Sequence, residues 1–474
     1  MKFIKIINLV IIFSYCLSYR EPFLNLHSYS LEDFENLKER EVIKKQEDTK
    51  KRKNVLTYYF AEELIRKKIN KEGKEDYKII LQGGATILHE DTQISAPYIE
   101  IDSENNGIIS GGLVISLKNQ NTFLYAQKGE YNRKEEFVKL LGNPYMKLNS
   151  NDSYILITTD EIQRNIAEKT IIFKKYVKIF SKDWSLLGDE SIYYDNSKEF
   201  VLKENPVLVG KKIYLTAKTM IYKSDEKKII VNQKPIMITT IVSEGKKENP
   251  NKEKKNSSQN SKKEDEVIKE KLIITANTIE YFFETKDTNQ DLKKIQKGIL
   301  RGNVLMTSKT KTFKGEEFLI LGKDISFVES NNAVTLEDKK ENFFLRSNYM
   351  LYDLKNRNLL LKKNPELILY EKQSTNSSLE YIENDKQIKE KLTAEIIERD
   401  FLNEITIAKG NVHLIRKEEE MFSEYAKFNE KEEKIELLGN PILRRKKTEL
   451  HCKKIDVFKD KVEIYGELRT IVYD

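Results

Sequence analysis

The sequence predicts an all-β protein, an elongated array of about twelve repeats that each contribute two strands. Two series of short motifs alternate along the chain without a miss, and the apolar residues between them recur with period 2, the period of a strand. The composition agrees, because the 474 residues include 24 Tyr and 21 Phe but only 8 Pro and 18 Gly. Aromatic and β-branched side chains fit a pleated, half-buried surface.

The first series is a corner motif, in which Gly-Asn or a related pair precedes Val or Pro and then an apolar run. Gly and Asn tolerate left-handed backbone angles, and Pro is acceptable as the first residue of a strand. Each copy therefore predicts a tight corner followed by a strand. The clearest copies start at Gly142, Gly302, Gly410 and Gly439, weaker ones include Gly84, Gly112, Asn205, Lys234, Asn332, Asn364 and Gly466, and Tyr176 stands where a twelfth is due.

The second series is a small residue, followed three positions on by an apolar residue and two further on by an aromatic or aliphatic one, as in Ala217, Met220 and Tyr222. A small side chain suits a place where backbones come close, so we expect two sheets that converge along an edge. Asp or Asn often ends the strand, as at Asp353 and Asp400. The small positions are Ala61, Ala96, Ala126, Thr159, Gly188, Ala217, Ala276, Gly315, Ser347, Ala394, Ser423 and Cys452.

The spacing of the corners places the array at residues 55–474. Most corners are 27 to 32 residues apart, enough for two strands of roughly 8 to 10 residues and two corners. Two insertions explain the large exceptions. Residues 243–270 are rich in charge and predict a disordered loop, and residues 371–391 form a second polar insertion.

The N-terminus predicts export. Lys2 and Lys5 precede a short apolar region, and small residues around Leu17 fit a cleavage site, so residues 1–18 are interpreted as a signal peptide. Attachment of lipid to Cys16 is the alternative. Residues 19–54 form a charged segment that is either a helix, starting near Ser30, or disordered. We therefore expect a periplasmic protein, with an association with the inner or outer membrane left open.

Strand alternation predicts which side chains face the shared interior of the two sheets. Counting two residues on from the third corner residue brings large apolar side chains to one depth in nine repeats. The repeats near Tyr176 and Ala333 fit after a shift of one residue, through Val177/Ile179 and Val334/Leu336, which a bulge would produce. The predicted lining residues are Ile87, Ile115, Met146, Leu208, Met237, Met306, Leu367, Leu414 and Leu443.

Alternating Gly-Asn-Val/Pro corners and Ala-x-x-φ-x-Tyr-Asp strands resemble the OstA-like repeats of lipopolysaccharide-transport proteins. That family includes the periplasmic bridge protein LptA and the N-terminal region of LptD. The likeness covers about residues 55–474. It implies an elongated, open-ended β-jellyroll whose apolar groove passes lipid acyl chains between membranes, without catalytic residues. It also implies partners among other bridge proteins, or a second copy, joined by edge-strand addition.

The residues themselves predict no enzyme, metal site or cofactor. Cys452 stands next to His451, but it occupies a small-residue position of the second series. The four histidines lack the spacing of metal ligands, and no Gly-rich nucleotide fingerprint is present. The 83 basic and 76 acidic residues are interspersed without a basic patch, which argues against a nucleic-acid partner.

Three functions are compatible with these patterns. The first is a lipid-binding bridge that carries lipopolysaccharide or another acylated lipid in an apolar groove. The second is a structural or adhesive β-repeat protein with a packed interior, which binds other proteins through its exposed face. The third, a polysaccharide-active enzyme, needs acids clustered on one face, and the repeats do not show them. The sequence leaves open whether the interior is a groove or a packed core.

Overall fold

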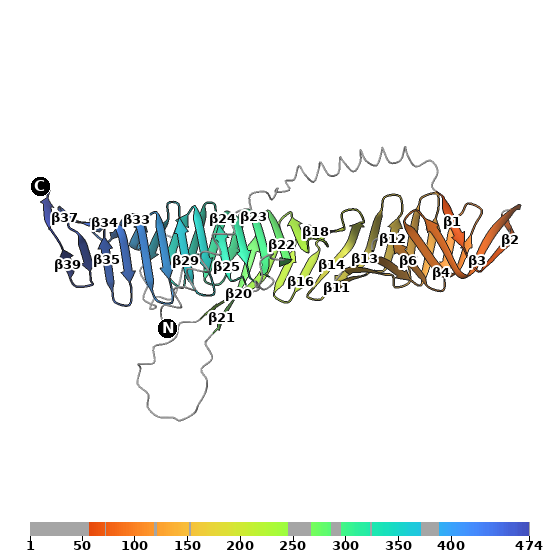
Figure 1. Cartoon of the computed structure of the whole chain (residues 1–474), viewed down its shortest axis with the longest axis horizontal. Helices are drawn as coiled ribbons and strands as arrows, with labels where there is room; N and C mark the ends of the chain where they lie inside the picture. Colours follow the sequence, from red (N-terminus) through yellow and green to blue (C-terminus); the bar gives the residue numbers. More distant parts are fainter. Residues whose placement is uncertain are drawn as a thin grey trace, which may run out of the picture. The chain divides into compact units, whose positions relative to one another are not determined.

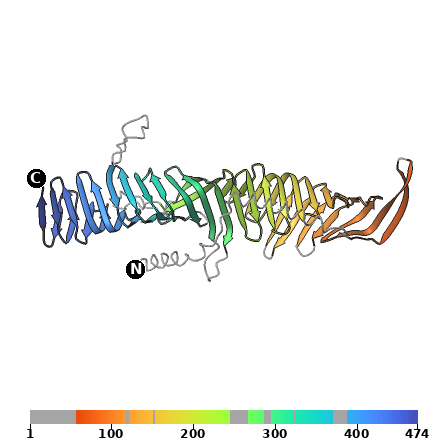
Figure 2. The ribbon, with the colours of Figure 1, turned by 90° about the horizontal axis from the view of Figure 1, so that it is seen from above.

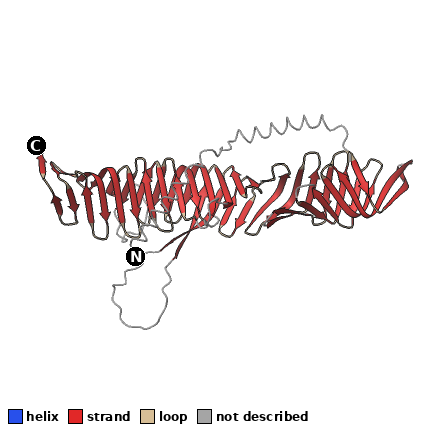
Figure 3. Cartoon of the chain, viewed as in Figure 1, coloured by secondary structure: helices blue, strands red, loops and turns tan. Residues whose placement is uncertain are grey.

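The computed structural model describes residues 56–71, 73–117, 121–150, 153–244, 267–285, 295–322, 325–370 and 388–473. The predicted signal peptide, the segment 19–54 and most of the two insertions lie outside these ranges. Within them the regular structure consists of β-strands (Figure 3), which confirms the predicted fold class. No helix of the described ranges meets the length and apolarity that a membrane span requires.

The strands pair antiparallel in one continuous hydrogen-bonded system, and successive strands follow one another in chain order (Figures 1 and 2). The pairing register divides this system into two ladders, called sheet A and sheet B. Eight long strands run through both: β3 (Lys74–His89), β4 (Thr92–Ile101), β13 (Thr170–Phe180), β14 (Trp184–Tyr194), β23 (Ile295–Thr307), β24 (Lys311–Leu321), β33 (Ile405–Arg416) and β34 (Glu419–Asn429).

The shorter strands belong to one sheet each. Sheet A contains β6 (Leu113–Leu117), β7 (Thr122–Ala126), β10 (Tyr145–Ser150), β11 (Ser153–Thr158), β16 (Val207–Gly210), β17 (Ile213–Thr216), β20 (Ile236–Glu244), β21 (Val267–Thr275), β26 (Val334–Asp338), β27 (Phe343–Ser347), β30 (Glu366–Tyr370), β31 (Ile388–Thr393), β36 (Ile442–Arg445), β37 (Thr448–His451) and β40 (Arg469–Val472). Sheet B contains β2 (Glu63–Lys71), β5 (Gly107–Ser110), β8 (Lys128–Asn132), β9 (Phe137–Leu141), β12 (Glu161–Asn165), β15 (Glu199–Lys203), β18 (Thr219–Lys223), β19 (Lys228–Asn232), β22 (Thr278–Thr285), β25 (Phe327–Ser330), β28 (Tyr349–Asp353), β29 (Asn358–Lys362), β32 (Ile396–Asp400), β35 (Lys434–Leu438), β38 (Lys454–Val457) and β39 (Val462–Tyr465), while β1 (Thr57–Phe60) pairs with β3.

The predicted corners are the places where the chain passes from one sheet to the other. At ten of the twelve corners two consecutive residues have positive φ, for example Gly302 (73°) and Asn303 (49°), or Lys175 (66°) and Tyr176 (52°). At the other two, Gly466 is left-handed alone and Asn332 is not. The long strands shift their register here, as between Arg301 and Val304. The corner prediction is confirmed, including the copy at Tyr176.

The small residues of the second series lie beside these corners. Ala96 pairs with Ala85, Gly315 with Val304 and Ser423 with Val412. Where the small residue carries a hydroxyl, this group donates a hydrogen bond to a nearby backbone carbonyl, as from Thr159 to Lys174 (2.7 Å). This series therefore forms the close edge of the two sheets, called the corner edge.

Each repeat differs from the prediction in one respect. Where two strands are predicted, hairpin turns divide the repeat into four short segments, two in each sheet. The turn at Glu90 and Asp91, for example, separates β3 from β4, and Glu90 is left-handed (φ 51°) without being Gly or Asn. The predicted Asp and Asn strand ends do cap these turns: Asp353 Oδ1 accepts a hydrogen bond from the Asn356 N–H (2.9 Å).

The predicted insertions are shorter than expected at their ends. Ser243 pairs with Ile268 and Glu244 with Val267, so β20 and β21 continue as a hairpin into the range 243–270. Likewise β31 begins at Ile388, inside the range 371–391. Cross-strand pairing therefore orders these polar residues even though their composition favours a loop. The remainder of both insertions lies outside the described residues.

The corner glycines offer a direct test of the fold. A Cβ on Gly302 (φ 73°) would overlap the Asn277 side-chain amide, whereas a Cβ on Gly84 (φ 69°) would meet nothing within 4 Å. Gly84→Ala should therefore cost only the backbone strain, about 1 kcal/mol. Gly302→Ala should cost about 2 kcal/mol or more, because Asn277 must also move. Urea unfolding measures both, and equal losses would contradict the packing of Asn277 over the corner.

Candidate functional site

The nine predicted lining residues lie in one cross-strand row on the inner face of sheet A. Ile87 pairs with Ile94, which pairs with Ile115, and the same step links Leu215 to Met237 and Met237 to Ile274. The row continues through Met306, Leu367, Leu414 and Leu443. Val177 and Ile179, and Val334 and Leu336, are buried as the shifted pattern predicts. The structure thus brings all nine together at one depth.

Sheet B faces this row with aromatic side chains that lie nearer the hairpin turns. Tyr193 pairs with Phe200, and Phe200 with Tyr222. The ring centroids of Tyr193 and Phe200 are 4.6 Å apart. Six repeats carry an aromatic residue five positions after the small residue of the second series, and all six are buried: Tyr131, Tyr193, Tyr222, Tyr281, Tyr352 and Phe428. The inner face of sheet B is therefore largely apolar, but two repeats carry buried arginines at the same position, Arg164 and Arg399.

The interior is closed in this structure. The nine lining side chains are 0 to 4% exposed, so no space as large as a water molecule touches most of them. An acyl chain is wider than a water molecule. These residues can contact a lipid only after the two sheets separate, and their role as lipid lining remains a prediction.

The two edges of the interior are held in different ways. At the corner edge the chain itself connects sheet A to sheet B in every repeat. At the opposite edge, called the open edge, each sheet ends in its own hairpin turns. In the described residues only side chains bridge the sheets there. Separation is therefore easier at the open edge than at the corners.

Aromatic pairs bridge part of the open edge. Trp184 of sheet A packs between Tyr222 and Phe283 of sheet B, with centroid distances of 4.7 and 4.8 Å. Further along, Phe343 of sheet A stacks on Phe401 at the end of β32, at 5.2 Å. The sequence patterns gave no signal for these pairs, because the partners are far apart in the chain.

Polar pairs bridge the open edge between these aromatic contacts. Arg164 of β12 is fully buried, and its guanidinium contacts Asp195 of sheet B (2.5 Å) and Asp91 of the β3–β4 turn in sheet A (3.5 Å). Burial raises the pKa of Asp195 to about 6, although the guanidinium of Arg164 acts in the opposite direction. His89 of sheet A shares a 2.8 Å hydrogen bond with the Tyr131 hydroxyl of sheet B.

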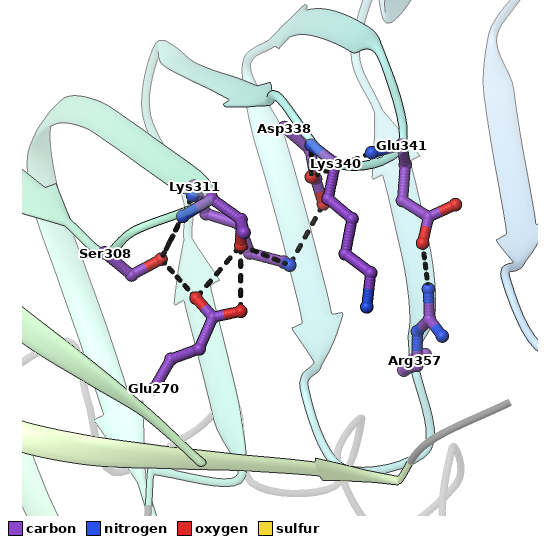
Figure 4. A network of polar contacts seen from close by, with 8 residues as sticks. Glu270, Ser308, Lys311, Asp338, Lys340, Glu341 and Arg357 are labelled. Carbon is purple, nitrogen blue, oxygen red and sulfur yellow. Dashed lines mark hydrogen bonds and ion pairs between the residues drawn. The ribbon is translucent and has the colours of Figure 1, made fainter. Parts of the chain in front are cut away.

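A third polar bridge lies at the open edge and links consecutive hairpins, from the β20–β21 hairpin to the β28–β29 turn (Figure 4). The Ser308 hydroxyl donates to Glu270 (2.8 Å), and the Lys311 ammonium contacts Asp338 (3.0 Å). Burial acts to raise the pKa of Glu270, but hydrogen bonds from Ser308 and Thr310 leave it below its usual range.

In this bridge an ion pair joins sheet A to sheet B. It forms between Glu341, in the β26–β27 turn of sheet A, and Arg357, in the β28–β29 turn of sheet B. The Asp338 carboxylate also accepts the backbone N–H of Glu341 (3.1 Å), so the turn that carries Glu341 is fixed to its neighbours. Among the described residues, non-covalent contacts alone therefore close the open edge.

A depression of about 960 Å³ lies outside this interior, over consecutive corners. Its lining includes the exposed side chains of Glu316, Arg346, Asn364 and Glu395. Apolar residues such as Val334 and Pro365 also line it, so this depression has a mixed surface and lies apart from the predicted lining residues.

The remaining candidate chemistry has a structural explanation. Cys452 is buried, its thiol donates a hydrogen bond to the Lys454 carbonyl (3.3 Å), and burial raises the pKa of this thiol. Across the described ranges no cluster of three or more His, Cys, Asp or Glu side chains is arranged to hold a metal ion.

Comparison with known proteins adds little to this geometry. Neither a protein-family model nor a curated protein matches the chain. One similar solved structure is LptH from Pseudomonas aeruginosa, described as the LptA homologous periplasmic component of the conserved lipopolysaccharide transport device. It is 10% identical, covers 31% of this chain and 82% of its own, and gives a TM-score of 0.18. At this level the likeness places no functional residue in the present chain.

Proposed function

We propose that this chain is an exported, non-enzymatic lipid-binding protein that takes acyl chains between its two sheets. In this proposal it acts as a periplasmic bridge, carrying lipopolysaccharide or another acylated lipid toward the outer membrane. Apolar area transferred from water into a protein interior gains roughly 25 cal/mol per Å². A continuous apolar row would keep an acyl chain out of water along its route.

The observation that carries the proposal is the difference between the two edges of the interior. In the part of the chain that the structure describes, an unbroken apolar row runs through sheet A from Ile87 to Leu450, beside an edge that only side-chain contacts close. Such an edge allows a lipid to enter from the side while the corners keep the sheets connected. The predicted lining residues from Ile87 to Leu443 would then contact the acyl chain.

The sheet edges at the C-terminal end support partners of the same kind. Within the described residues β40 pairs with β37, and β39 pairs with β38, on one side only. Val472 and Tyr465 are exposed there. Unpaired strands of this type accept a further strand from another bridge protein or a second copy.

A structural or adhesive β-repeat protein is the second candidate. The near-complete burial of the lining side chains favours it, because a permanently packed core has the same exposure. The two candidates differ in whether the open edge ever admits a lipid.

Trp184 makes that difference measurable, because it is the chain's only tryptophan and bridges the open edge. If lipid enters there, 9,10-dibromostearic acid should quench Trp184 fluorescence in a saturable manner, since bromine quenches only at close contact. Acrylamide in water should quench weakly, because Trp184 is 7% exposed. Fluorescence titration of the full chain measures both.

The matched control moves the reporter to the outside. In a Trp184→Phe/Ile108→Trp variant the indole occupies an outward position that is 64% exposed in the natural chain, and the brominated acid should no longer quench saturably. Absence of saturable quenching in the natural chain would reject lipid entry and favour the packed structural protein.

A further inference from the structure

The outer face of sheet A is unusually apolar between β11 and β23. Outward side chains there alternate with the buried lining residues, as strand geometry requires. Six of the outward ones, all large and apolar, are 37 to 43% exposed. They are Phe180, Val209, Tyr214, Ile236, Ile273 and Leu305, and together they define the outer apolar face.

The register shows which of these side chains are neighbours. Val209 lies opposite Tyr214, Tyr214 opposite Ile238, and Ile238 opposite Ile273. Directly opposed residues of an antiparallel pair have Cβ atoms roughly 5 Å apart. Val209, Tyr214, Ile238 and Ile273 therefore form one contiguous patch, of the kind that marks an interaction site on a protein surface. Ser185 lies between this patch and Phe180, and Thr275 lies between Ile236 and Leu305.

The charged side chains on the outer apolar face are positive. The outward residues of β11 to β23 whose side chains are described include Lys178 and Lys271 and no carboxylate. The hairpin-turn margin adds Lys182, Lys211 and Lys212, with Asp183 paired to Lys211 at 2.8 Å. The margin at the corner edge carries both positive and negative side chains. The excess of positive charge therefore belongs to the outer apolar face itself and to its margin at the open edge.

The same sheet looks different beyond β24. There the outward positions carry ion pairs that cross the strands, such as Lys391 with Glu366 (2.7 Å) and Arg444 with Glu449 (3.1 Å). Paired charges suit a surface that faces water. The apolar face thus does not continue beyond β24, whereas on its N-terminal side the outward Tyr145 and Tyr154 are also exposed.

We propose that the outer apolar face binds the surface of an anionic lipid bilayer. Its branched and aromatic side chains would enter the region between headgroups and acyl chains, while the lysines contact lipid phosphates. A second copy of the chain is a poorer occupant, because a symmetric contact through this face would bring lysines against lysines. This inference goes beyond lipid entry into the interior and does not depend on it.

Vesicle flotation of the full chain tests the proposal. Vesicles of phosphatidylcholine with added phosphatidylglycerol should bind the chain at least about tenfold more tightly than pure phosphatidylcholine, because each lysine near an anionic surface contributes about 1 kcal/mol. Val209→Glu/Ile273→Glu should reduce binding to the anionic vesicles by about tenfold or more. Val209→Ser/Ile273→Ser, which adds no charge, should reduce it in the same direction.

The matched control places the same two charges elsewhere. Ile108 and Ile388 are exposed by 64 and 54% and lie outside the face, so Ile108→Glu/Ile388→Glu should bind nearly as well as the natural chain. Equal binding to neutral and anionic vesicles, no binding to either, or an equal loss in the control would overturn the proposal. So would a dimer in gel filtration that Val209→Glu/Ile273→Glu dissociates. Flotation does not involve Trp184, so its result is independent of acyl entry.

Discussion

Replacing Met237 with arginine should disrupt the β-structure around β20 and lower the free energy of unfolding by about 4 kcal/mol or more. Met237 is 1% exposed and lies between Leu215 and Ile274 in the inner row of sheet A. A guanidinium there would lose its water without gaining a carboxylate partner. Urea unfolding followed by far-ultraviolet circular dichroism measures the loss.

Two variants of the same strand serve as controls. Met237→Leu preserves the volume and polarity of the side chain, and should cost no more than about 1.5 kcal/mol. Ile236→Arg carries the same charge one residue away, on the outer face, where the side chain is 41% exposed. It should change stability by no more than about 0.5 kcal/mol. Equal tolerance of arginine at both positions would mean that the interior holds water, as an open groove does.

The corners and the inner row could be predicted from the sequence because both follow from local rules. A corner needs residues that adopt positive φ, and Gly302-Asn303 shows this need in its residue types. Strand alternation then fixes the face of each following side chain, which is why Met237 and Leu367 were placed correctly in the interior.

The hairpin turns were harder to predict. Several left-handed turn residues, such as Glu90, Lys169 and Lys227, are of types that rarely mark a turn. The turn is set instead by the sheet pairing on both sides and by a capping Asp or Asn. As a result the sequence showed two strands in each repeat where the structure has four segments.

The closure of the open edge could not be predicted at all. Trp184 contacts Phe283, and Arg164 contacts Asp91, across long stretches of chain and between different sheets. No local pattern encodes such a pair. The separation between the sheets, which decides whether the interior is open or filled, depends on these contacts together.

Removing the guanidinium of Arg164 should be the second large effect. Arg164→Leu leaves the Asp195 carboxylate buried without its partner at 2.5 Å, a change that costs about 3 to 5 kcal/mol at neutral pH. The double variant Arg164→Leu/Asp195→Leu removes both charges and should recover most of that loss, because a buried pair replaced by apolar residues is often neutral. Urea unfolding compares the two variants.

The loss of stability in Arg164→Leu should also depend on pH, and ionisation of the Asp195 carboxyl determines the direction of this dependence. Burial holds the pKa of Asp195 at about 6, above its usual range, and without Arg164 it should rise further. When a carboxyl has a higher pKa in the folded than in the unfolded protein, its protonated form stabilises the fold. This stabilisation is fully present below the pKa of the unfolded state and is lost as pH rises through the pKa of the folded state. Arg164→Leu should therefore be less destabilising at pH 5 than at pH 8. An equal loss at both pH values would mean that Asp195 escapes to solvent in the variant, and that the open edge is already loose at this point.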